Sequence, residues 1–317
     1  IFQIFFLGNK EGREALALAS EAFMSLQGAS ESVISGEQGA DLVLFDEAEK
    51  LFEEAKEKGS FLLQGNSEWL SQPKQVESLK NLLDAGTLMA EVGQSIGEAR
   101  LAFTTLPETG SLTDYLRSIS EEHLEPDAIK LHQINELLST VDLSGTEFES
   151  KFLEFKDKLS ALTALFDMWV SAKEPLLAAL GDHTPQHYLV LLQNNDEMRQ
   201  GGGFIGSIAV VEVNDGRLAD LSFHDVYDYD GRYFEHLEVP VHELKALTPE
   251  WRLRDSNISP DFPVSAEKAM WLLEQEGGPG VDGVIGLNLS AAQALLEDTG
   301  PLKLPSLKKE ISAETFP

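Results

Sequence analysis

The residues of this chain that could hold a ligand lie mostly in its second half. Arg199, Gly201, Gly202 and Gly203 form the first group. Backbone amides of a glycine turn can hold a phosphate, and an arginine can add two parallel hydrogen bonds. This turn leads into an apolar stretch typical of a strand, whereas a phosphate-binding loop leads into a helix. The alternative is a tight turn or bulge that lets Phe204 enter a sheet.

Three acids downstream form a second group, which could hold Ca²⁺ or Mg²⁺. Asp225, Asp228 and Asp230 precede Gly231, and carboxylates are the ligands that these cations prefer. An EF-hand would also need an oxygen ligand at position 226 and an acid at position 237, which are Val226 and Leu237. The alternative is a solvated acidic loop without a metal. No cofactor follows with certainty from this pattern.

A third group lies at positions 254–263. Arg254, Asp255, Asn257 and Asp261 crowd charge and amide groups into a segment that also contains prolines. Asx turns and pairing of arginine with aspartate would explain an ordered loop without function. A loop that faces a ligand explains the same residues, so both interpretations stay open.

Amphipathic helices precede these groups. Apolar residues recur at three- and four-residue spacing, which predicts an elongated antiparallel bundle over residues 9–184. A loop rich in glycine and serine is expected at positions 28–39. Gly86, Gly93 and Gly97 lie inside the third predicted helix, where glycine costs about 1 kcal/mol against alanine. We therefore expect a neighbouring helix to approach closely there. The predicted helices are 11–26, 44–55, 73–106, 126–141 and 146–179.

Strands and helices alternate from residue 185 to 317. A hairpin turn is predicted at 214–216, and Ser290 is expected to cap a helix at 291–297. The fold class is thus α+β and multi-domain: a helical bundle followed by an α/β domain with a mixed sheet. The chain stops at Pro317 without a clear final element, which suggests a truncated domain. The other predictions are strands at 188–192, 204–213, 217–222, 281–287 and 302–304, and a helix at 264–276.

Composition restricts the partners. Lys and Arg total 24 against 54 Asp and Glu, so the net charge is −30. A chain of this charge repels polyanions, which makes nucleic acid an unsuitable partner and an anionic membrane surface an unsuitable dock. The chain contains no cysteine, so it has no disulfide, no thiolate zinc site and no thiol nucleophile.

The first seven residues are strongly apolar. They are too few to span a bilayer, which needs about 20 residues. One interpretation is that residues 1–8 end a membrane helix that begins upstream. The other is an apolar end packed on the domain or against a second copy.

Four motifs in the second half resemble a bacterial family catalogued as Domain of Unknown Function 4012. They are QNNDEMRQGGGFIGS at 193–207, RDSNISPDFPVSA at 254–266, VDGVIGL at 281–287 and TGP at 299–301. The helical first half with its apolar start also looks like the layout of that family. The resemblance implies an N-terminal membrane helix and an extracytoplasmic body anchored in the cell membrane. It implies no established activity.

A more distant similarity is to the LytR-CpsA-Psr phosphotransferases, which attach glycopolymers from polyprenyl-pyrophosphate lipids to the cell wall. By that resemblance Arg199 would stand for the first arginine of the pyrophosphate site. Glycines at 201–203 replace the acidic segment of those enzymes, and His224 stands where they have an arginine. These departures remove cations that bind pyrophosphate.

Two functions follow as expectations. The first is a cell-envelope protein that presents an α/β head on a helical stalk, where it binds another envelope component or assembles with itself, with no catalysis assured. The second is a LytR-CpsA-Psr-like phosphotransferase or polyprenyl-phosphate binder that uses Arg199, Arg254 and the acids at 225, 228 and 255. The distinguishing feature is whether the arginines converge on an open pocket or pair with carboxylates.

Overall fold

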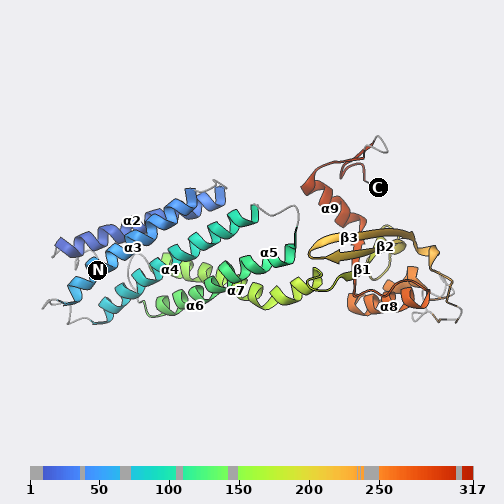
Figure 1. Ribbon diagram of the computed structural model, residues 1–317, viewed down its shortest axis with the longest axis horizontal. Helices are drawn as coiled ribbons and strands as arrows, with labels where there is room; N and C mark the ends of the chain where they lie inside the picture. The colour runs from blue at the N-terminus through green and yellow to red at the C-terminus, as the bar shows by residue number, and fades with distance from the viewer. Residues whose placement is uncertain are drawn as a thin grey trace. The chain divides into compact units, whose positions relative to one another are not determined.

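The chain forms two compact units, Ile1–Leu176 and Leu177–Pro317. This computed structural model describes residues 10–35, 40–64, 73–104, 110–141, 149–233, 235, 237–238, 250–304 and 309–316. Helices make up the described part of the first unit, and the second contains a mixed four-stranded sheet (Figure 1), so the predicted α+β class is confirmed. The predicted end of a membrane helix at 1–8 lies outside the described residues. Among the described helices, none combines the length and apolar composition that a bilayer crossing requires.

The first two helices of the first unit are longer than the sequence predicted, whereas the helix predicted at 126–141 ends at Ser139. The predicted loop at 28–39 is wrong for residues 28–35, which continue the first helix because Ala29 is fully buried in the core. Residues 112–124 were not predicted as helix, yet Ser111 caps a helix there by accepting a hydrogen bond from the Asp114 amide at 3.0 Å. The elements are α2 Lys10–Ser35, α3 Ala40–Gln64, α4 Pro73–Thr104, α5 Leu112–Ile119, π-helical η2 Ser120–Leu124, α6 Glu125–Ser139 and α7 Glu149–Ala179.

Close helix packing explains the glycines inside α4. A Cβ atom on Gly93 would lie 2.2 Å from the ring of Phe45 in α3, and one on Gly86 would lie 2.5 Å from the ring of Phe52. Phe52 is completely buried in the core that α2, α3 and α4 share. The predicted close approach of a neighbouring helix is therefore confirmed at both positions.

The second unit is organised around a sheet with strand order β3-β2-β1-β4. β1 pairs antiparallel with β2 and parallel with β4, and β2 pairs antiparallel with β3. The 214–216 turn between β2 and β3 has positive φ at Asp215 and Gly216, which confirms the predicted hairpin. The strands are β1 Gln186–Asn194, β2 Phe204–Asn214, β3 Arg217–Asp225 and β4 Gly283–Asn288, with a separate pair β5 Leu302–Leu304 and β6 Lys309–Ile311.

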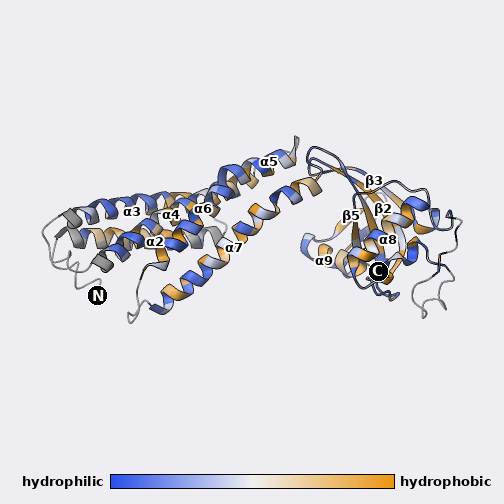
Figure 2. Cartoon of the chain, turned by 90° about the horizontal axis from the view of Figure 1, so that it is seen from below, coloured by the Kyte–Doolittle hydropathy of each residue, from blue (hydrophilic) through white to orange (hydrophobic). Residues whose placement is uncertain are grey.

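Helix α8 Phe262–Gln275 lies along one face of this sheet, as Figure 1 shows. We call this the inner face; it presents Leu189, Leu191 and Ile208, all completely buried. Side chains alternate along a strand, so the residues between these point to the other, outer face. Figure 2 shows apolar residues along the strands as well as along α8. The outer face consists of residues 188, 190 and 192 in β1, 207, 209 and 211 in β2, 221, 223 and 225 in β3, and 283, 285 and 287 in β4.

Shorter elements complete the second unit. The 3₁₀ segments η3 Val226–Asp228 and η5 Leu253–Ile258 carry many of the polar residues noted in the sequence. Helix α9 Leu289–Thr299 begins two residues before its predicted start. The prediction that Ser290 caps it is wrong, because the Asn288 side chain accepts the hydrogen bond from the Ala291 amide at 2.8 Å. Asn288 thus ends β4 and starts α9.

Candidate functional site

The glycine turn between β1 and β2 has a structural cause for each glycine. Gly202 and Gly203 have φ values of 116° and 133°, which side chains rarely allow. A Cβ atom on Gly203 would lie 2.3 Å from the carbonyl oxygen of Asn194. One on Gly201 would lie 2.5 Å from the carbonyl oxygen of Asn257. The geometry matches the tight-turn interpretation.

Two amides and two carbonyls of this turn are already hydrogen-bonded within the protein. The Gly201 amide donates to the Asn257 carbonyl at 2.9 Å, and the Asn257 side-chain amide donates to the Gly203 carbonyl at 2.6 Å. Gln193 donates to the Gly201 carbonyl at 2.9 Å. Asn257 is completely buried, so it fastens the turn to η5 from inside. A phosphate cradle needs free amides, and the Gly201 amide is not free.

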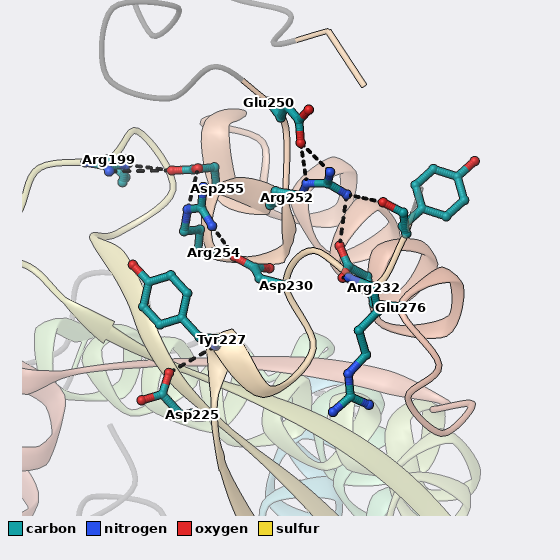
Figure 3. A network of polar contacts seen from close by, with 11 residues as sticks. Arg199, Asp225, Tyr227, Asp230, Arg232, Glu250, Arg252, Arg254, Asp255 and Glu276 are labelled. Atoms are coloured by element: carbon teal, nitrogen blue, oxygen red, sulfur yellow. Dashed lines mark hydrogen bonds and ion pairs between the residues drawn. The ribbon is translucent and has the colours of Figure 1, made fainter. Parts of the chain in front are cut away.

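Arg199 and Arg254 both face Asp255 (Figure 3). The Arg199 Nε and the Asp255 Oδ1 are 3.5 Å apart, and the Arg254 Nε is 3.5 Å from the Asp255 Oδ2. Arg254 also donates from Nη1 to the Asp230 Oδ2 at 2.8 Å. The two carboxylates are almost completely shielded from solvent. These four residues form a continuous ion network, the Arg199–Asp230 network.

Arg252 belongs to a second set of ionic contacts, also drawn in Figure 3. It pairs with Glu250, donates to the Tyr233 carbonyl at 2.8 Å, and lies 3.5 Å from the fully buried carboxylate of Glu276. Glu276 also accepts a hydrogen bond from the Arg232 amide at 2.9 Å. Sequence reasoning missed Glu276, because an acid at the end of a predicted helix is usually solvated.

Burial dominates the electrostatics of the network. It raises the pKa of Asp230 to about 6; Glu276 adds to the rise, while Arg254 opposes it. The Asp230 Oδ1 and the Asp255 Oδ2 are buried without a hydrogen bond, as is the Ser256 hydroxyl. Unsatisfied buried groups of this kind weaken the protein that contains them. The network therefore holds its loops at an energetic cost.

The three acids of the predicted metal loop separate. The Asp225 carboxylate accepts a hydrogen bond from the Tyr227 amide at 3.0 Å, Asp228 is exposed, and Asp230 pairs with Arg254. Across the described ranges, no three acidic or histidine side chains gather closely enough to hold a metal ion. The structure thus contradicts a metal group made of these three acids. The Asp225 carboxylate instead starts η3.

Two further predicted site residues lie elsewhere. His224 in β3 is 3.3 Å from the Ser222 hydroxyl, and its ring packs edge-on against Tyr229. Asp261 occupies the position before α8, is exposed, and makes no side-chain cap bond. The structure therefore brings together Arg199, the glycine turn, Arg254, Asp255 and Asn257, but neither His224 nor Asp261.

A lysine between two tryptophans was also missed as a group. The Lys268 amine lies 4.3 Å from the ring centre of Trp251 and 3.8 Å from that of Trp271. Burial lowers the pKa of Lys268. These rings hold η5 and α8 together through cation–π contacts. Residues 268 and 271 are three positions apart, so a helix brings them together, but nothing in the sequence indicates that Trp251 lies beside them.

The arrangement can bind loops together, and its arginines are neutralised by carboxylates of the same unit. No curated protein and no solved structure matches the chain. A family model does match its second part. Residues 183–316 correspond to the family described as protein of unknown function (DUF4012), so this portion of the chain is similar to that family.

Proposed function

We propose that the chain is a cell-envelope protein, anchored in the membrane by a segment upstream of residue 8, whose extracytoplasmic second unit binds an envelope component or a second copy without catalysis. One observation supports the absence of catalysis most strongly. Arg199 and Arg254, the cations that a pyrophosphate would need, are each held by Asp255 in the Arg199–Asp230 network. The envelope location rests on the resemblance of the four motifs.

The alternative is a phosphotransferase or polyprenyl-phosphate binder acting on cell-surface glycopolymers. To bind a pyrophosphate, Arg199 and Arg254 would have to break their contacts with Asp255, and the buried Asp255 carboxylate would then have no cation beside it. Removing one partner from a buried ion pair costs about 3–5 kcal/mol. Pyrophosphate binding would have to offset this cost, so the alternative is the weaker proposal.

A titration of the whole chain with a short-chain polyprenyl pyrophosphate, with and without Mg²⁺, tests the two against each other. A LytR-CpsA-Psr enzyme serves as the positive control. We expect no Mg²⁺-dependent binding to this chain. Mg²⁺-dependent binding that disappears in a folded Arg199→Ala variant would overturn the non-catalytic proposal.

The location is testable with a single cysteine, since the chain has none of its own. Met198 is 88% exposed, so Met198→Cys presents a thiol in the glycine-turn segment with little structural change. In intact producing cells we expect a membrane-impermeant maleimide to label this variant. Labelling that requires permeabilised cells would contradict an extracytoplasmic location.

A further inference from the structure

The outer face of the sheet is apolar, and its large side chains on the two edge strands, β3 and β4, are exposed. Phe223 in β3 is 66% exposed and Ile285 in β4 is 47% exposed, and their neighbours Leu221 and Leu287 are exposed as well. The inner face differs completely, because Leu189 and its neighbours are fully buried against α8 and η5. A soluble unit rarely leaves such large side chains together on one exposed face without a partner.

Helix α9 does not cover this face. It follows β4 directly, yet none of its residues is buried, and Leu295 in its middle is 63% exposed. Within the described residues, then, Phe223 and Ile285 have solvent above them. Val190 and Ala209 connect these two residues in one apolar row across the sheet. Ala209 is small and buried between its larger neighbours, so the exposed surface of the row comes from its two ends.

The chemistry of the face indicates what could cover it. Apart from Tyr188, Asp225 is the one ionisable side chain on the outer face. The Asp225 carboxylate already accepts a hydrogen bond from the Tyr227 amide. The face thus offers a partner almost no charge to recognise, and a flat apolar surface fits another flat apolar surface best. Sheets pack face to face about 10 Å apart with their side chains interdigitating.

We propose that the outer face is a self-association surface, on which the outer face of a second copy packs to form a symmetric dimer. Four strands about 4.8 Å apart and three rows about 6.7 Å apart give a flat footprint of about 400 Å² per copy. Protruding side chains and the flanking Leu218 enlarge it, against about 800 Å² per partner in a standard interface. The area therefore corresponds to a weak, reversible dimer.

Charge sets the conditions under which this dimer forms. Each chain has a net charge of −30, so two copies repel each other at low ionic strength. Salt screens that repulsion over about 8 Å at 0.15 M, while the apolar contact itself persists. Dimerisation through the outer face should thus strengthen with added NaCl, whereas a dimer held by ion pairs would weaken.

Sedimentation equilibrium of the whole chain over a wide concentration range tests this inference. We expect a reversible dimer in 0.5 M NaCl and at least a tenfold weaker one in Phe223→Asp. Val264→Asp is the matched control, because Val264 is 52% exposed on α8, which covers the inner face. It should dimerise like the parent. Circular dichroism must show that both variants are folded.

A second variant tests the same surface without introducing the negative charge of the Phe223→Asp side chain. Phe223→Cys, with a nitroxide label on its thiol, should give a short label-to-label distance in concentrated samples, and Val264→Cys a longer one or none. A chain that stays monomeric throughout, or whose dimer is unaffected by Phe223→Asp, would overturn the inference. This inference rests on the proposed function, because it names a second copy of the chain as the partner. If the dimer is not found, the chain could still bind another envelope component, and the outcome of the lipid titration would not change.

Discussion

The two units bury charge in different ways. In the first unit two buried aspartates form separate pairs, Asp41 with Arg100 at 2.7 Å and Asp127 with Lys130 at 3.9 Å, beside apolar cores built from regular helix stripes. In the second unit the Arg199–Asp230 network joins the glycine turn, η3 and η5, which are far apart in sequence. Local periodicity thus organises the bundle, while long-range ion pairs fix the irregular loops of the second unit. Four sets of substitutions test this difference.

The largest effect is expected when the centre of the network is removed. Asp255→Ala would leave Arg199 and Arg254 buried without their shared partner, which should destabilise the second unit by about 3–5 kcal/mol. Urea denaturation followed by tryptophan fluorescence measures this, because Trp251 and Trp271 lie in that unit. Glu154→Ala, which removes a fully exposed helix pair with Lys158, should cause no measurable loss. Equal effects would remove the contrast between the units.

A smaller loss is expected when the glycine turn gains a side chain. Gly203→Ala places a Cβ atom 2.3 Å from the Asn194 carbonyl oxygen in a left-handed conformation. The strain should cost about 1–3 kcal/mol in urea denaturation. Gly280→Ala is the control, because its Cβ atom would meet nothing within 4 Å. If both variants matched the parent, the turn would not depend on its glycines.

Two helix glycines should respond with opposite signs. Gly93→Ala drives a Cβ atom into the Phe45 ring, and overpacking of about 1–3 kcal/mol should exceed the gain of about 1 kcal/mol in helix propensity. Gly59→Ala meets nothing within 4 Å, so it should stabilise the bundle by about 1 kcal/mol. Thermal unfolding by circular dichroism compares them. If both variants were more stable than the parent, the Phe45 side chain could move aside at little cost, and the close α3–α4 packing would not depend on Gly93.

The last test concerns a change in stability with pH, not a loss of stability at one pH. Folding raises the pKa of Asp230 from 3.8 to about 6, so the folded state holds this proton more tightly than the unfolded state. The resulting stability is fully present below pH 3.8 and is lost as the pH rises through about 6. Asp230→Asn cannot titrate, so the difference in unfolding free energy between variant and parent should change between pH 4 and 6. A constant difference would contradict the raised pKa.

Much of the fold was predictable because its signals are local. The apolar run at 188–192, the turn at 214–216 and the helix glycines at 86 and 93 each have one physical interpretation that neighbouring residues already determine. The errors have tertiary causes. Residues 28–35 are helical because Ala29 is buried, and Asn288 replaced Ser290 as the cap because β4 ends at that residue.

The candidate site was less predictable for the same reason. The sequence by itself determined which groups were available: a glycine turn, arginines, and several acids. Only the tertiary structure decided that Arg199 meets Asp255 across 56 positions of sequence, and that Glu276 turns inward to Arg252 and the Arg232 amide. It likewise decided that Phe223 faces solvent while Leu189 is buried. Alternation along a strand shows which residues share a face, but the elements packed on that face determine which one is covered.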